Sequence, residues 1–141
     1  GAVRRTVQLV TDSIPRALGI PSDEVLVVTA RRAGIAGASA LDMALAGALG
    51  TAGTRPRAVT VHEAAGRRSA AVVVVLAAEA AGSLSRPLVA TAFGLADQHL
   101  SVVHACGPTL AEAVTRVPGR ARVTRLTGLL KAHAGLLAGA A

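Results

Sequence analysis

The sequence has very few aromatic side chains and almost no sulfur. Its 141 residues include one Phe, one Cys, no Trp and no Tyr. The single cysteine, Cys106, excludes a disulfide within the chain and a metal site built from several cysteines. Proteins that bind single-stranded nucleic acid stack the bases on aromatic rings, so the near absence of such rings argues against that role.

Long apolar runs are also missing. The longest, 70–78, is far shorter than the roughly 20 residues that a membrane-spanning helix needs. No secretory signal is recognisable at the start of the sequence. These features predict a soluble, cytoplasmic protein that does not contact a membrane.

The composition is otherwise that of one folded domain, because 52% of the residues are hydrophobic and only 16% are charged. The formal net charge is +7, and arginine supplies nearly all of the positive charge. The arginines form scattered pairs, such as Arg31-Arg32 and Arg67-Arg68, and no single basic run. We interpret them as solvated surface residues or as a basic face toward an acidic protein, and we expect no nucleic-acid partner.

The hydrophobic periodicity predicts strands that alternate with helices. Strands are expected at 7–10, 24–29, 58–62, 71–76, 100–104 and 122–126, and helices at 39–49, 108–117 and 129–141. The segment 87–93 fits a strand or the start of a helix. This alternation favours an α/β fold with a mostly parallel sheet.

The segment 25–49 combines a strand, a loop of small residues and a helix. Such a segment can present a nucleophile at a helix N-terminus, where free N–H groups and the helix dipole stabilise an anion. The segment resembles the β-ketoacyl synthase family, whose elbow reads Ala-Cys-x-Ser-Gly-x-x-Ala-Leu-x-x-Ala. The matching residues are Ala33, Gly37, Ala40, Leu41 and Ala44.

Two positions of that elbow differ from the family. Gly34 occupies the position of the acyl-carrying cysteine, and Ala36 the position that often holds serine. Further segments occur in the family's order, among them 72–76, 86–88, 94–99 and 107–114. The resemblance implies a thiolase-like layered fold, much shortened, with an N-terminal half at 1–82 and a C-terminal half at 83–141 that form one compact unit.

The resemblance also implies a function without catalysis, because glycine cannot be acylated. It points to a subunit of the chain-length-factor type, which pairs with an active ketosynthase as a heterodimer and shapes the tunnel for the growing acyl or polyketide chain. An acyl carrier protein would meet it through that complex. The residues implied for the tunnel are Gly34, Ile35, Ala36, Gly37 and Met43, and His133 is the candidate for a remaining family histidine. No metal and no cofactor is expected.

A second interpretation stays open. Gly34, Gly37 and Gly47 have the Gly-x2-Gly-x9-Gly spacing of nucleotide-binding universal stress proteins, which implies a small module that binds adenine nucleotides. Ala48 replaces the Ser or Thr expected after the third glycine. The glycines are equally compatible with a plain loop and helix start.

The remaining polar residues have structural interpretations. Cys106 is expected to be a buried structural thiol. His62 and His104 each end a predicted strand and are expected to be structural, since no third metal ligand is apparent. Ser39 and Asp42 are expected to serve the N-terminus of the helix at 39–49.

Overall fold

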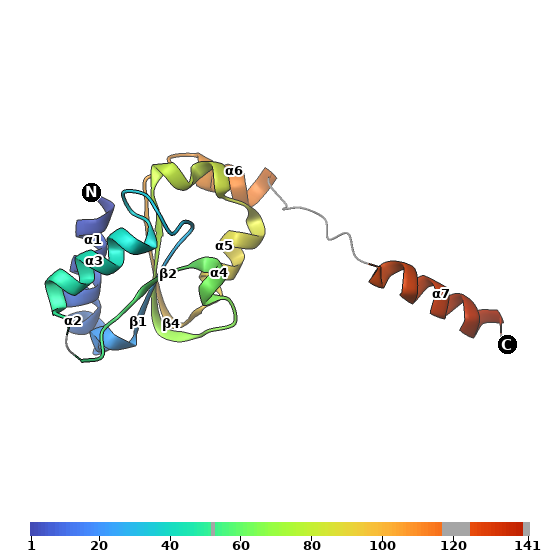
Figure 1. Cartoon of the computed structure of the whole chain (residues 1–141), viewed down its shortest axis with the longest axis horizontal. Helices are drawn as coiled ribbons and strands as arrows, with labels where there is room; N and C mark the ends of the chain where they lie inside the picture. The colour runs from blue at the N-terminus through green and yellow to red at the C-terminus, as the bar shows by residue number, and fades with distance from the viewer. Residues whose placement is uncertain (52, 117–124, 140–141) are drawn as a thin grey trace.

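The protein is an α/β structure built on one parallel sheet of four strands (Figure 1). The computed structural model describes residues 1–51, 53–116 and 125–139. In spatial order the sheet is β2-β1-β3-β4. The strands are β1 (Val25–Thr29), β2 (Ala58–Thr60), β3 (Ser69–Leu76) and β4 (Ala96–His104). The α/β class and the parallel sheet predicted from the sequence are confirmed.

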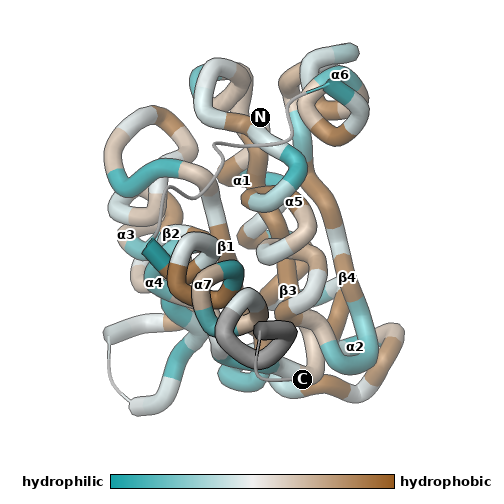
Figure 2. The backbone as a smooth tube through the Cα atoms, turned by 90° about the vertical axis from the view of Figure 1, so that its right-hand side faces the viewer, coloured by the Kyte–Doolittle hydropathy of each residue, from teal (hydrophilic) through white to brown (hydrophobic). Residues whose placement is uncertain are grey.

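Strand β3 lies at the centre of the core. Its side chains alternate between two apolar clusters: Val72 and Val74 belong to one, and Val73 and Val75 to the other. These four valines have no solvent-exposed surface. Figure 2 shows the strongly apolar character of β3 within the sheet. A continuous apolar run is what a parallel strand covered on both faces requires.

Helices cover both faces of the sheet, so the body has three layers (Figure 1). One face is covered by the N-terminal helical segment and by α3 (Ala38–Leu49). The other face is covered by α4 (Val61–Ala64), α5 (Arg86–Phe93) and α6 (Thr109–Arg116). The remaining elements are the short η2 (Ser22–Glu24) and η3 (Ala78–Ser83), and α7 (Leu126–Gly139).

The predicted strand at 7–10 is wrong. The chain there is helical without interruption through α1 (Ala2–Gln8), the π-helix η1 (Leu9–Ser13) and α2 (Ile14–Leu18). Val3, Val7, Val10 and Ile14 recur at helical spacing and pack against the cluster that contains β1. Burial of this longer apolar face determines the structure of the short Val-Gln-Leu-Val segment.

The other predicted elements correspond to observed ones, with shifts at their ends. The segment 87–93, left undecided by its periodicity, is helical. The predicted strand 58–62 is shorter, because Thr60 caps α4: its hydroxyl accepts from Glu63 N, and the Glu63 carboxylate accepts from Thr60 N. The predicted strand 122–126 falls mostly outside the described residues, and Leu126 begins α7.

The sheet joins the two segments, 1–82 and 83–141, that the family resemblance implies as halves. Strand β3 lies within 1–82 and strand β4 within 83–141, and these two strands pair in parallel from Ala71 and His99 to Leu76 and His104. Among the described residues, no helix has both the length and the apolar character that crossing a bilayer requires.

A bidentate ion pair attaches α3 to the segment before β2. The two carboxylate oxygens of Asp42 accept from Arg55 Nη1 and Nη2 at 3.0 and 3.1 Å, and Oδ1 also accepts from Ala58 N at 3.3 Å. Asp42 therefore anchors β2. The prediction that Asp42 serves the N-terminus of α3 is wrong. The hydrogen bonds from Arg55 hold the pKa of Asp42 below its usual value, against an opposing effect of burial.

We predict that Asp42 makes the stability of the protein depend on pH. Because its pKa is lower in the folded chain, its contribution is complete above the pKa of the unfolded chain and is lost as the pH falls through the folded value. Urea unfolding followed by far-UV circular dichroism should show the largest difference between the wild type and Asp42→Asn at neutral pH, shrinking toward pH 3. Asp12→Asn, which removes an exposed pair with Arg16, is the control and should show little difference. A difference for Asp42→Asn that stays constant with pH would contradict the assignment.

Candidate functional site

The loops that follow β1 and β3 meet at the carboxyl-end edge of the sheet. Strand β1 lies between β2 and β3, so the connections leaving β1 and β3 diverge to opposite faces. In open parallel sheets, ligands bind at this switch point. The loop 30–37 after β1 contains most of the residues singled out in the sequence, and β3 is followed by the η3 segment.

The loop 30–37 is closed by hydrogen bonds of its own backbone. Gly37 N donates to Gly34 O at 3.2 Å, Ala38 N to Arg31 O at 3.0 Å and Ser39 N to Arg32 O at 3.0 Å. These donors include N–H groups at the start of α3, which would otherwise be available to an anion. Carbonyl groups of the loop thus hold its end and the first residues of α3 in place.

Glu79 joins this loop to the segment after β3. Its Oε1 accepts from Ala36 N at 3.1 Å, and its backbone carbonyl accepts from Arg31 Nη1 at 3.2 Å. Ala36 is 3% exposed, so this N–H needs a partner within the protein. The neighbouring Arg32 forms an ion pair with Glu63 of α4. A carboxylate of the chain thus lies at the switch point, where it accepts a backbone N–H.

The two glycines of the loop are required for different reasons. Gly34 has φ +117° and lies against the carboxylate of Glu79, so a side chain at this position would be strained and would displace Glu79. A Cβ on Gly37 would lie 2.6 Å from backbone atoms of Arg32 and Ala33. Gly34 lies on the exposed loop, three positions before the N-cap of α3, which is Gly37. Residue 34 therefore lies in the loop and not at the N-terminus of α3, where the sequence analysis expects a nucleophile position.

The five predicted tunnel residues do not surround a common cavity. Ile35 and Ala36 line a hollow of about 310 Å³ beside Val3 and residues 77–79, and Met43 lines another of about 270 Å³ beside Arg57. Ala36 and Gly37 are buried, whereas Ile35 is 84% and Met43 76% exposed. Two large apolar side chains near this loop therefore face solvent.

The structure does not bring the three glycines of the nucleotide-binding interpretation together. Gly47 lies inside α3, ten positions after Gly37, which corresponds to about 15 Å along the axis of a helix. A phosphate cradle needs several unoccupied N–H groups, and those of Ala36, Gly37, Ala38 and Ser39 already donate within the protein.

The histidines are spread over α4, β4 and α7. His62 is in α4 after the edge strand β2, and His104 ends β4 at the opposite edge of the sheet, so the two are not neighbours. His133 lies on the exposed part of α7. In the described ranges, no group of three His, Cys, Asp or Glu side chains has the arrangement of a metal site.

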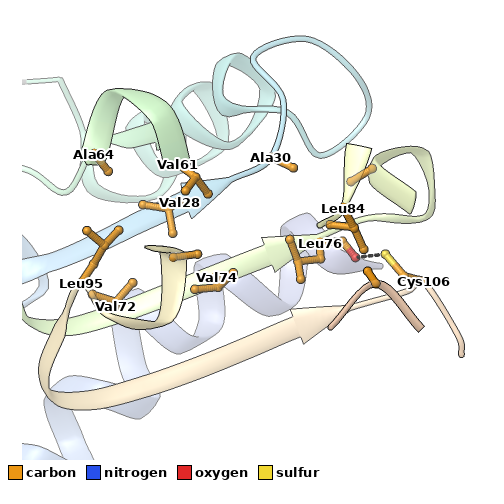
Figure 3. Packing of buried hydrophobic residues seen from close by; sticks show 13 residues of the cluster. Val28, Ala30, Val61, Ala64, Val72, Val74, Leu76, Leu84, Leu95 and Cys106 are labelled. Atoms are coloured by element: carbon orange, nitrogen blue, oxygen red, sulfur yellow. Dashed lines mark hydrogen bonds between the residues drawn. The ribbon is translucent and has the colours of Figure 1, made fainter. Parts of the chain in front are cut away.

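Cys106 is the buried structural thiol expected from the sequence. It is 6% exposed, and its Sγ lies 3.1 Å from the backbone oxygen of Leu76 (Figure 3). The backbone oxygen of Ala77 lies at the same distance. Burial raises the pKa of this thiol, although a backbone hydrogen bond from Ala105 opposes the effect. The nucleophilic form of cysteine is the thiolate, so this environment opposes reactivity.

Glu79 is the site residue that sequence reasoning missed as a functional position. The available signal was its place in the sequence: it is the first charged residue after the most strand-like stretch, 71–76. A charged residue just beyond a buried parallel strand lies at the edge where such sheets hold their polar groups.

Comparison with known proteins adds no assignment, since neither a protein family nor a curated protein matches the sequence.

We predict that Glu79 stabilises the loop through its acceptor oxygen. Glu79→Ala leaves the Ala36 N–H without its partner, which should cost about 1–3 kcal/mol of unfolding free energy, whereas Glu79→Gln keeps an acceptor and should lose much less. Urea unfolding and amide exchange at Ala36 measure both effects. The matched control is Glu112→Ala, which removes an exposed carboxylate from α6. Equal losses for the Ala and Gln variants would show that charge, and not the hydrogen bond, is what matters.

We also predict that Cys106 is unreactive in the folded protein. At pH 8 the thiol should react with a disulfide reagent at least 100-fold more slowly in native buffer than in denaturing urea, because the thiolate is disfavoured and access is blocked. The reaction is followed by the absorbance of the released aromatic thiol. Rapid reaction in native buffer would mean that Cys106 is accessible and would contradict the burial described above.

Proposed function

We propose that this protein is a non-catalytic partner subunit, and that its partner is an active ketosynthase. In this proposal it is a shortened relative of the chain-length-factor type, and the surface around the loop 30–37 and the first turns of α3 shapes the partner's acyl or polyketide tunnel. The thiolase-like form of the fold and the contact with an acyl carrier protein belong to the same proposal.

The observation that carries the proposal is the exposure of Ile35 and Met43. Scattered single apolar residues are common on surfaces, but these are two large side chains, 84% and 76% exposed, on one loop-helix unit. Residues that cover another subunit's cavity have to be apolar and outward-facing in the isolated chain.

The rigidity of the loop supports a binding role for Ile35. Hydrogen bonds within the loop and from Ala36 to Glu79 fix the backbone on both sides of Ile35. A side chain presented by a fixed backbone loses less conformational freedom on binding than one presented by a flexible loop. The sequence resemblance to the β-ketoacyl synthase family covers the same segment.

The proposal is tested by binding to an active type II ketosynthase prepared without its usual partner. The expected result is a stable heterodimer by size-exclusion chromatography with light scattering. Ile35→Ser or Met43→Ser should weaken the dissociation constant, measured by calorimetry, at least fivefold, as truncating a buried interface residue does. The control is Leu18→Ser, which removes a half-exposed leucine. Leu18 lies before the start of β1, whereas the loop 30–37 follows its end.

Three results would overturn the proposal. One is no complex at 50 µM of each protein, and another is equal weakening by Leu18→Ser and Ile35→Ser. The third is a rise in Tm with millimolar ATP, which would favour the nucleotide-binding interpretation in its place.

A further inference from the structure

Two hollows adjoin along α5, on the face of the sheet that α4, α5 and α6 cover (Figure 1). The first, of about 450 Å³, is lined by α4, by the start of α5 and by the segment before it. The second, of about 320 Å³, is lined by the turn between α4 and β3 and by the end of α5. Thr91 of α5 lines both hollows, which are together called the α4–α5 cleft below. Their volumes are those of pockets that hold small molecules.

The first hollow lies at the carboxyl-end edge of the sheet. Its lining includes Ala30, which follows β1, His62, which follows β2, and Ser83, which follows β3. These three strands are neighbours in the order β2-β1-β3. The cleft therefore opens where the ends of parallel strands place the ligands of open α/β sheets.

The polar groups of the first hollow suit a hydroxyl group of a ligand. Ser83 Oγ donates to Ala80 O at 2.8 Å, so its lone pairs remain to accept a hydrogen bond. Ser85 Oγ accepts from Leu88 N at 3.4 Å, so its hydrogen remains to be donated. His62, in the same lining, offers one donor and one acceptor nitrogen when neutral. A hydroxyl group both donates and accepts, as this set requires.

The second hollow has a cation, Arg67. Among the described residues Arg67 forms no ion pair, whereas its neighbour Arg68 pairs with Asp97. No acidic residue is found among the described residues that line the cleft, and Glu63 of α4 pairs with Arg32. A guanidinium group binds carboxylates and phosphates through two parallel hydrogen bonds. The second hollow is therefore suited to an anionic group.

We propose that the α4–α5 cleft binds a small organic anion. Its carboxylate or phosphate group pairs with Arg67, and a hydroxyl group at its other end meets the polar lining of the first hollow. The apolar lining, which includes Ala65 and Leu88, contacts the carbon chain between these ends. Ser85 and Thr91 are six positions apart on α5, about 9 Å along the helix axis, so a chain of about six carbons suits the cleft.

This site does not depend on the proposed pairing with a ketosynthase. The cleft lies on the face of the sheet covered by α4, α5 and α6, whereas Met43 is in α3 on the other face. Binding of the anion is measured on the isolated chain, without a ketosynthase. A failure of one proposal therefore leaves the other standing.

The first test uses two probes that differ only in their anionic group, 6-hydroxyhexyl phosphate and 6-hydroxyhexanoate. Each is added to the isotope-labelled chain up to about 20 mM, and amide chemical shifts are followed by NMR. At least one probe should give saturable shifts concentrated in 61–68 and 83–94. Tighter binding of the phosphate assigns the site to phosphate monoesters, and tighter binding of the carboxylate assigns it to carboxylic acids. The neutral 1,6-hexanediol should bind about tenfold more weakly or not at all, because it has no charge for Arg67.

The second test assigns the two ends of the ligand. Arg67→Gln should raise the dissociation constant of the better probe about fivefold or more, because charge-assisted hydrogen bonds are lost. Its matched control is Arg4→Gln, which removes the same charge from an exposed position of α1 and should change little. Ser83→Ala should weaken the better probe but not the same compound without its hydroxyl group. Far-UV circular dichroism checks that each variant is folded.

Three results would overturn the proposal. One is the absence of saturable shifts with both anions at about 20 mM, a concentration that detects even weak ligands. Another is equal weakening by Arg67→Gln and Arg4→Gln, which would indicate attraction to the net positive charge and not to a site. The third is binding of 1,6-hexanediol as tight as that of the anions, since Arg67 would then have no part in recognition.

Discussion

The parallel pairing of β3 with a strand on each side is the interaction on which the rest of the structure depends. It joins β3 to β1 from Val25 and Ala71 onward and to β4 up to Leu76 and His104. With one Phe and no other aromatic residue, the core is filled by valine, leucine and alanine. Valine is restricted at χ1, so the alternating valines of β3 give both apolar layers a fixed shape. The helices on the two faces pack against this one strand and its neighbours.

The same pairing creates the candidate site, because it brings the ends of β1 and β3 together where their connections diverge. Polar backbone groups at such a point must pair with a ligand or with the protein. Here the protein supplies the partners itself, through Glu79 and the closed loop 30–37. Ile35 lies on the outward surface of this loop, and hydrogen bonds hold the backbone on both sides of it.

Periodicity predicted the class of fold and most of its elements because the strands β1 and β3 are continuous apolar runs and the buried Leu41 and Leu45 of α3 recur at helical spacing. It failed at 7–10, where four residues alternate like a strand but belong to a longer helical stripe from Val3 to Ile14. The contact between Ala36 and Glu79 could not be predicted, because it depends on β1 and β3 being neighbours and separates residues far apart in sequence. Gly34, which lies against the Glu79 carboxylate, has φ +117°.

A chain of this size leaves a share of its apolar side chains exposed. A domain of this length buries only about two thirds of the surface of its unfolded chain, so apolar side chains left outside can be covered by other subunits. In this protein they occur at separate places: Ile35 and Met43 on the loop-α3 unit, and Val114 beside the groove lined by α5 and α6. The loop-α3 unit and that groove lie on opposite sides of the sheet, so a subunit bound at one leaves the other exposed.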